Sequence, residues 1–114
     1  MTADLPSFEL VVESGADDER VSFIPRGELD LATAPELEEK VLAAVREGDR
    51  SVVLDLRELT FMDSTGVRTI VAAHKAAEES GADLRVVRPE SGNPVARVIE
   101  ISGIDSALGL VDEA

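Results

Sequence analysis

Apolar and polar residues alternate over the first quarter of the chain in the manner of β-strands. Residues 8–13 show this alternation imperfectly, and the polar stretch 14–19 predicts a turn after which residues 20–26 return as the second strand of a hairpin. Pro25 lacks the N–H group that a central strand donates, so it predicts an edge strand or a strand end. Gly27 predicts a tight exit from the second strand.

Three later segments are also predicted to be strands. Residues 51–56 are too continuously apolar for a half-exposed strand, which predicts a central one, followed by a polar turn over residues 57–60. Residues 83–87 predict another strand, and residues 107–111 predict a short last one.

Between these strands, apolar residues recur at helical spacing, and a glycine stands where each helix is expected to end. Thr33 and Glu36 have the spacing of a capping box. The predicted helices run from Thr33 to Gly48, from about Ser64 to Ser80, and from Asn93 to Gly103. Strand and helix therefore alternate from residue 20 onward, which predicts an α/β fold with at least some parallel strand pairs.

The composition fits one small domain with an aliphatic core. At 114 residues, without an internal repeat or linker, the chain is expected to be a single domain over residues 1–114, with its core at about 8–111 and short tails. The absence of cysteine excludes disulfides, thiol catalysis and cysteine metal sites, and it fits a reducing cytoplasm.

The net charge of −13, from 24 acidic and 11 basic residues, narrows the classes of partner. Nucleic acid and anionic membrane surfaces are disfavoured, because affinity for both comes largely from Lys and Arg. No secretory signal is visible, and no apolar run approaches the roughly 20 residues that cross a bilayer. We therefore expect a cytoplasmic protein whose acidity attracts a basic protein partner or simply keeps the chain soluble.

The most informative segment is residues 61–67, Phe-Met-Asp-Ser-Thr-Gly-Val, at the start of the second predicted helix. Ser64 is expected at or beside the N-cap, where a hydroxyl can accept a hydrogen bond from a free backbone N–H. A helix N-terminus also tolerates negative charge, so a phosphate on Ser64 need not unfold the domain. This hydroxyl is therefore a candidate switch.

Two stretches combine with this order of strands and helices: Gly-Glu-Leu-Asp at 27–30, and the segment 61–67 about thirty residues later. Together they resemble the STAS domain family, specifically the bacterial anti-sigma factor antagonists, over about residues 8–111. The resemblance implies a mixed β-sheet of four to five strands, with three to four helices packed mainly on one face.

The resemblance also implies a regulatory binding protein that is not an enzyme and that needs no cofactor and no metal. Unphosphorylated members of the family bind an anti-sigma factor that is itself a serine kinase, and so free the sigma factor. The kinase then phosphorylates the serine that matches Ser64, the complex separates, and a PP2C-type phosphatase resets the switch.

The residues expected to form the partner-binding face surround Ser64, with Thr65 as a rival phosphoacceptor. They are Asp30, Phe61, Met62, Asp63, Ser64, Thr65, Gly66 and Arg68. Arg68 departs from the family, in which a small residue often stands two positions after the motif glycine. The chain ends at Ala114, whereas many relatives carry a further C-terminal helix.

Several of these residues also have a structural interpretation. Asp30 either contacts the partner or belongs to the turn before the first helix. Asp63 is a second candidate for the N-cap, or it holds the Ser64 hydroxyl in place. Gly66 permits the close approach of another backbone or simply allows helix–strand packing.

Arg68 lies four residues after Ser64, so both can share one side of the helix. Its guanidinium either clasps a phosphate on Ser64 in cis or is a solvated or partner-facing charge. Of Phe61 and Met62, one is expected to point inward and the other toward the surface, where it would suit a binding patch.

Two other functional classes remain in view. One is a scaffold subunit of a stress-sensing, transporter or lipid-transfer assembly. The other is a small hydrolase that uses Ser64 with His74, the only histidine. His74 shares the apolar stripe of its helix, which favours a half-buried structural role, and no third triad member and no Gly-rich phosphate loop with Lys is evident.

Overall fold

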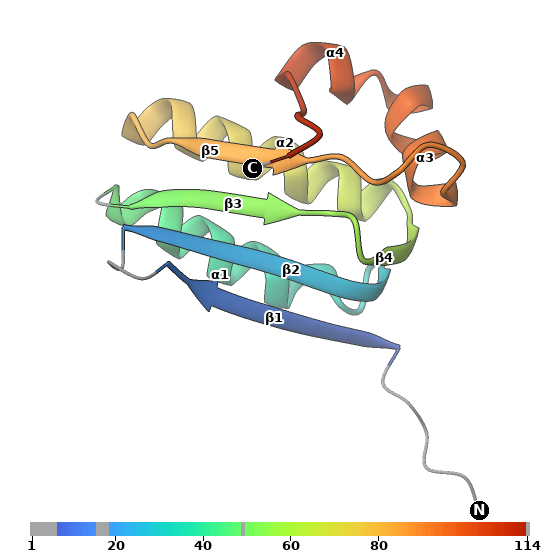
Figure 1. The fold of residues 1–114 in the computed structure, drawn as a ribbon, viewed down its shortest axis with the longest axis horizontal. Coiled ribbons are helices and arrows are strands. Elements are labelled where there is room, and N and C mark those ends of the chain that lie inside the picture. The colour runs from blue at the N-terminus through green and yellow to red at the C-terminus, as the bar shows by residue number, and fades with distance from the viewer. Residues whose placement is uncertain (1–6, 16–18, 49, 114) are drawn as a thin grey trace, which may run out of the picture.

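The computed structural model describes residues 7–15, 19–48 and 50–113, which hold five strands and four helices (Figure 1). In chain order these are β1 (Phe8–Ser14), β2 (Arg20–Leu29), α1 (Ala34–Glu47), β3 (Ser51–Asp55), β4 (Leu59–Met62), α2 (Ser64–Ser80), β5 (Leu84–Val87), α3 (Pro94–Ser102) and α4 (Ile104–Leu108). The predicted α/β class is confirmed.

The strands form one mixed sheet in the order β1-β2-β3-β5, and β4 pairs with the C-terminal end of β2. The β1–β2 hairpin is antiparallel, and the other pairs of named strands are parallel. Parallel neighbours need crossover connections, which α1 and α2 supply. These two helices lie behind the sheet on one face, and α3 packs beside β4 at one end (Figure 1).

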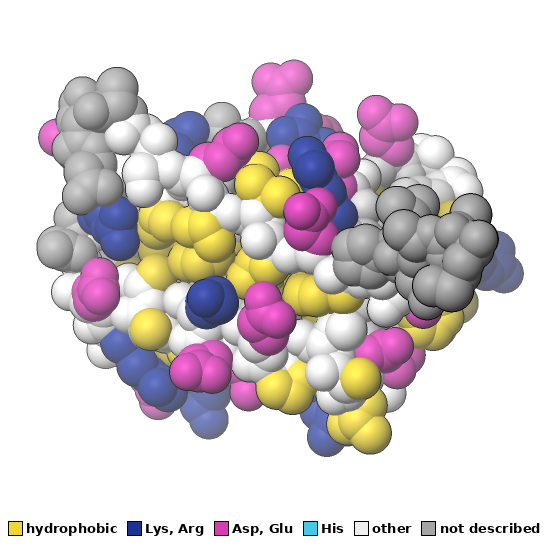
Figure 2. All heavy atoms as spheres, turned by 90° about the horizontal axis from the view of Figure 1, so that it is seen from below, with side chains coloured by type: hydrophobic (Ala, Val, Ile, Leu, Met, Phe, Trp, Pro, Cys, Tyr) yellow, Lys and Arg dark blue, Asp and Glu magenta, His cyan; other side chains and the backbone are white. Residues whose placement is uncertain are grey.

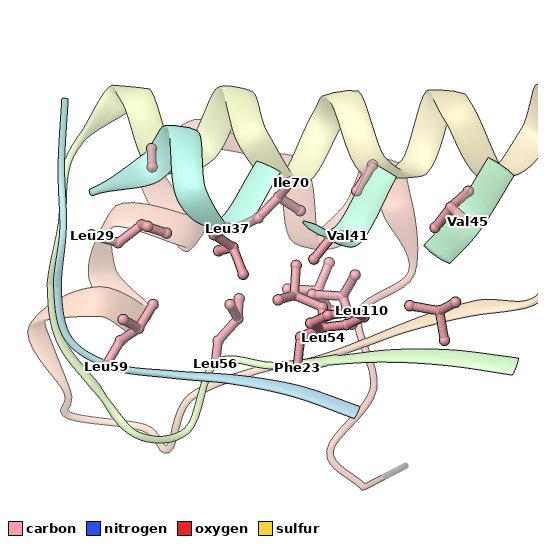
Figure 3. Close-up of a cluster of buried hydrophobic side chains, with 14 of the residues drawn as sticks. Phe23, Leu29, Leu37, Val41, Val45, Leu54, Leu56, Leu59, Ile70 and Leu110 are labelled. Carbon is pink, nitrogen blue, oxygen red and sulfur yellow. The ribbon is translucent and has the colours of Figure 1, made fainter. Parts of the chain in front are cut away.

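The core fills the space between the sheet and helices α1 and α2, and it is almost entirely aliphatic (Figure 3). Leu54 and Leu56 point into it from β3 and the turn after it, while Leu37 and Ile70 point into it from the two helices. Phe23 of β2 is the one aromatic side chain in this cluster of described residues. The sheet and both crossover helices are therefore held together by a shared set of buried side chains.

The β1 edge of the molecule is less well covered. Figure 2 views the molecule from this side and shows apolar side chains among scattered acidic and basic ones. A shallow apolar groove between β1 and α1 is lined in part by Val12, Phe23 and Ala44, and Val12 is exposed. Burial in β1 alternates only over its first three residues, where Phe8 and Leu10 pack against the core on either side of the exposed Glu9.

Strand β2 differs from its prediction, because Pro25 lies in the middle of a central strand. Its register with β3 ends at Phe23, and its register with β4 begins at Gly27, so no strand residue is paired with Pro25 on that side. Nor does the strand end at Gly27. It continues to Leu29 through a change of register at Gly27, where φ is 93° and a Cβ would lie 2.1 Å from the Ser7 carbonyl oxygen.

Two other predictions were wrong in part. The turn predicted over residues 57–60 includes the start of β4, a strand too short for its alternation to be visible. The strand predicted at 107–111 does not form: its first two residues end α4, and a single bridge joins Val111 to Val87. The third helix begins at Asn93 as predicted, and the Asn93 side chain accepts a hydrogen bond from the Val95 N–H (2.8 Å).

Asp55, at the end of β3, is held by the residue two positions later. Arg57 donates from Nε to Oδ1 (3.0 Å), from Nη2 to Oδ2 (2.8 Å) and from its backbone N–H to Oδ1 (3.0 Å). Burial acts to raise the pKa of Asp55, but the hydrogen bonds and charge of Arg57 outweigh it and hold the pKa below its usual value. The same contacts raise the pKa of Arg57.

Candidate functional site

Two strand-to-helix junctions lie next to each other at one end of the sheet. Leu29, the last residue of β2, pairs in register with Met62, the last residue of β4, so Asp30 and Asp63 follow at the same level. In both junctions the aspartate backbone oxygen accepts hydrogen bonds from the N–H groups three and four residues later. In both, Oδ1 accepts from the N–H two residues later, at 3.0 Å for Asp30 and 2.9 Å for Asp63.

At the second junction, Asp63 is the N-cap of α2 and Ser64 is the first helical residue. The prediction that Ser64 lies at or beside the N-cap is confirmed, with Asp63 supplying the cap. Ser64 is exposed, and its hydroxyl makes no hydrogen bond to any part of the chain that the structure describes. The serine hydroxyl is therefore accessible and has no structural bond to lose on modification.

At the first junction, the predicted capping box of Thr33 and Glu36 does not form. The Thr33 hydroxyl points back toward the strand, where it donates to the Glu28 carbonyl oxygen (2.8 Å) and accepts from the Asp30 N–H (2.9 Å). Asp30 Oδ1 accepts from the Thr33 N–H as well (3.2 Å). Asp30 is half-buried and shapes this turn, as its structural interpretation predicted.

Phe61 and Met62 point in opposite directions, as predicted: Phe61 is 46% exposed and Met62 only 2%. Gly66 is also buried, and a Cβ on it would lie 2.3 Å from Met62 Cγ and 3.1 Å from Leu29 Cδ2. Gly66 thus allows helix–strand packing against a side chain, not the approach of another backbone. Met62 and Gly66 were expected on the partner-binding face, and their burial removes both from it.

A groove runs between the N-terminal halves of α1 and α2, beside the two junctions. Its lining residues are Leu31, Ala34, Pro35, Glu38, Thr65, Arg68 and Thr69. Leu31 occupies the same position after Asp30 that Ser64 occupies after Asp63, and it is 74% exposed. Arg68 is exposed and makes no ion pair with any residue of the described ranges. Leu31 and Glu38 were not among the residues predicted for this site, although a leucine in the turn between Asp30 and Thr33 was a usable signal.

His74 does not join this site. It is half-buried on α2, with Nε2 3.5 Å from Glu78 Oε1 one turn later. Ten residues separate it from Ser64, which places it about 15 Å further along the helix axis. The structure therefore does not bring the two side chains of the hydrolase alternative together.

Within the described ranges, no three His, Cys, Asp or Glu side chains are grouped in a way that could hold a metal ion. No helix of those ranges has both the length and the apolar character needed to span a bilayer.

Comparison with known proteins identifies the family. Residues 17–112 match the family model described as "Mlab, STAS domain", and the chain therefore belongs to the STAS domain family. Among characterised proteins it is similar to the anti-sigma-B factor antagonist of Staphylococcus aureus, at 30% identity over 99 residues, which are 87% of this chain and 90% of that protein. The resemblance carried by segments 27–30 and 61–67 is confirmed.

Solved structures show the same fold. An anti-sigma factor antagonist from Mycobacterium paratuberculosis superposes with a TM-score of 0.78, at 27% identity over 94% of this chain and 87% of that one. The Bacillus cell fate determinant SpoIIAA in its phosphorylated form superposes with a TM-score of 0.65, at 22% identity over 86% of each chain.

Proposed function

We propose that this chain is an anti-sigma factor antagonist controlled by phosphorylation of Ser64. In its unphosphorylated form it binds an anti-sigma factor that is also a serine kinase, and the sigma factor is released. The kinase transfers the γ-phosphoryl group of ATP to Ser64 Oγ, the hydroxyl proton leaves, ADP is released and the complex separates. A PP2C-type phosphatase restores the hydroxyl, and the whole cycle takes place in the cytoplasm.

The observation that carries this proposal is the state of the Ser64 hydroxyl. It is exposed and unbonded within the described ranges, at the first position of a helix whose cap is supplied by Asp63. Phe61 exposes apolar surface close to it in sequence, and the names of the relatives point to a binding regulator, not an enzyme. An apolar contact beside a modifiable hydroxyl is suited to a partner whose affinity depends on modification.

Phosphorylation is expected to prevent docking without unfolding the domain. A phosphoserine adds about −1.5 to −2 charge and three acceptor oxygens. The α2 dipole stabilises a charge at this position by about 0.3–1 kcal/mol. The added bulk and charge must still be desolvated when a partner covers the site, and the likeness to phosphorylated SpoIIAA supports a fold that tolerates phosphate.

The test is to incubate the protein with a serine-kinase anti-sigma factor from the same organism and ATP, and to locate the added ~80 Da by mass spectrometry. Ser64→Ala should abolish the addition, whereas Thr65→Val, the matched control at the rival acceptor, should keep it. In binding assays, Ser64→Ala should bind the kinase constitutively and Ser64→Asp weakly. Equal binding by the alanine and aspartate variants would contradict the proposed switch.

A further inference from the structure

We infer that Arg68 binds two alternative anions: a carboxylate of the anti-sigma partner when Ser64 is free, and the phosphate when Ser64 is phosphorylated. This inference rests on the proposed function and adds the means by which modification reaches the partner contact. It unites the two roles that the sequence leaves open for Arg68, as a clasp in cis and as a partner-facing charge.

The groove between α1 and α2 indicates what the partner must offer. Leu31, Ala34 and Pro35 give it an apolar wall on the α1 side. Arg68 from α2 and Glu38 from α1 line the same groove, and no ion pair joins them. Such a groove fits a partner segment that carries an apolar side chain next to a carboxylate, because the apolar group covers Leu31 and the carboxylate meets the guanidinium.

The helix places the same guanidinium within reach of Ser64. Both residues lie in α2 at a spacing of four, so their β-carbons are about 5–6 Å apart on one face. An acidic group four residues before a basic one is also the favourable order along a helix. A phosphate on Ser64 can therefore take a bidentate contact from Arg68, which is free of competing ion pairs within the described part of the chain.

The two contacts compete for one cation, because a carboxylate and a phosphate brought together on the same guanidinium would repel each other. Phosphorylation then does more than add bulk, since it removes the cation on which the partner's carboxylate depends. The phosphate thereby becomes an intramolecular competitor that is always at high local concentration.

The first test needs no partner. Protein carrying phosphoserine at position 64 is titrated by ³¹P NMR as the wild type, as Arg68→Gln and as Arg46→Gln, a control that removes an exposed arginine from the far end of α1. Capture by Arg68 favours the dianion, so the phosphoserine pKa should be lower in wild type and in Arg46→Gln than in Arg68→Gln, by about 0.3 unit or more. Equal midpoints in all three proteins would overturn the inference.

The second test measures affinity for the serine-kinase anti-sigma factor in both states of Ser64. Without phosphate, Arg68→Gln should bind about tenfold more weakly than wild type, Arg68→Lys should lie between them, and Arg46→Gln should match wild type. The loss of affinity on phosphorylation should be several-fold smaller in Arg68→Gln than in wild type. A switch of undiminished size in Arg68→Gln contradicts this inference alone, whereas wild type that binds equally well in both states contradicts the proposed function itself.

Discussion

The two junctions that precede α1 and α2 share a pattern of backbone hydrogen bonds around their aspartates and differ in where their hydroxyl groups go. Asp30 and Asp63 follow paired strand ends and accept hydrogen bonds from the same relative N–H groups. In the first junction the Thr33 hydroxyl donates to the Glu28 carbonyl oxygen and accepts from the Asp30 N–H. In the second the Ser64 hydroxyl faces solvent and bonds no described residue.

This difference shows what makes a hydroxyl at a helix start available for modification. An aspartate that caps the helix leaves a following serine without a structural task. Thr33 stands at the third position after its aspartate and holds the turn together, while the same position in the other junction is Gly66. Position relative to the aspartate, more than residue type, separates the structural hydroxyl from the candidate regulatory one.

The largest expected effect on stability comes from adding a side chain at Gly66, the position that corresponds to Thr33 in the first junction. Gly66→Val should lower the free energy of unfolding by about 2–3 kcal/mol, because its Cβ would stand 2.3 Å from Met62 Cγ. Urea denaturation measures this loss. Adding Met62→Ala should recover part of it by making space, so strictly additive losses in the double variant would contradict the proposed cause.

A somewhat smaller loss is expected at the first junction. Thr33→Val removes the hydroxyl but keeps the shape, and it leaves the Asp30 N–H and the Glu28 carbonyl oxygen without their side-chain partner. We expect about 1–2 kcal/mol less stability by thermal or urea unfolding. The loss of stability in Thr33→Val is to be compared with that in Ser64→Ala, which should be smaller. A Thr33→Val variant as stable as wild type would contradict the structural role of the Thr33 hydroxyl.

The two aspartates should behave similarly, since the side chain of each accepts a hydrogen bond from the N–H two residues later, and Asp30 Oδ1 accepts one more from the Thr33 N–H. Asp63→Ala should cost about 1 kcal/mol, as is usual for the loss of an N-cap side chain, and Asp30→Ala about as much, because it removes the side-chain acceptor of the turn before α1. Amide hydrogen exchange should in addition show faster exchange at Thr65 N–H in Asp63→Ala and at Ala32 N–H in Asp30→Ala. A large cost at only one of the two sites would show that the junctions are not equivalent.

The Asp55 side chain also accepts a hydrogen bond from the N–H two residues later. Here that residue is Arg57, whose guanidinium donates to the same carboxylate, and no helix begins at this turn. Because the pKa of Asp55 is lowered in the folded state, its contribution to stability is present above its unfolded pKa of about 3.9 and is lost as pH falls through the folded value. The stability gap between wild type and Asp55→Asn should therefore be widest near neutral pH and narrow in acid. Urea midpoints at several pH values test this, and a gap that widens in acid would reverse the sign.

The smallest effect is expected at Ser64. Ser64→Ala should change the free energy of unfolding by less than about 0.5 kcal/mol, because the hydroxyl bonds no described residue and alanine is a good helix former. The same substitution should abolish control of partner binding. A large loss of stability would mean that the hydroxyl has a structural role after all.

Helix α2 was predictable almost to the residue, because its capping aspartate, apolar spacing and terminal glycine all agree. Strand β4 was not, since four residues with two exposed positions give no periodic signal. The direction of the Thr33 hydroxyl was also beyond the sequence, because the competing acceptor at Glu28 becomes a neighbour only when the turn has formed. The burial of Met62 and Gly66 likewise depends on their packing against β2.

The pairing of Leu29 with Met62 fixes the spacing of the exposed residues that follow these two strand ends. Leu31 and Ser64 each stand two residues beyond this pair, so the ladder of the sheet, and not the loops, fixes how far apart the exposed leucine and the exposed serine are. One residue inserted into either strand would shift one of them by about 3.3 Å and reverse the faces of the side chains between. A partner that contacts both Leu31 and Ser64 would then bind more weakly, even though every residue it contacts were still present.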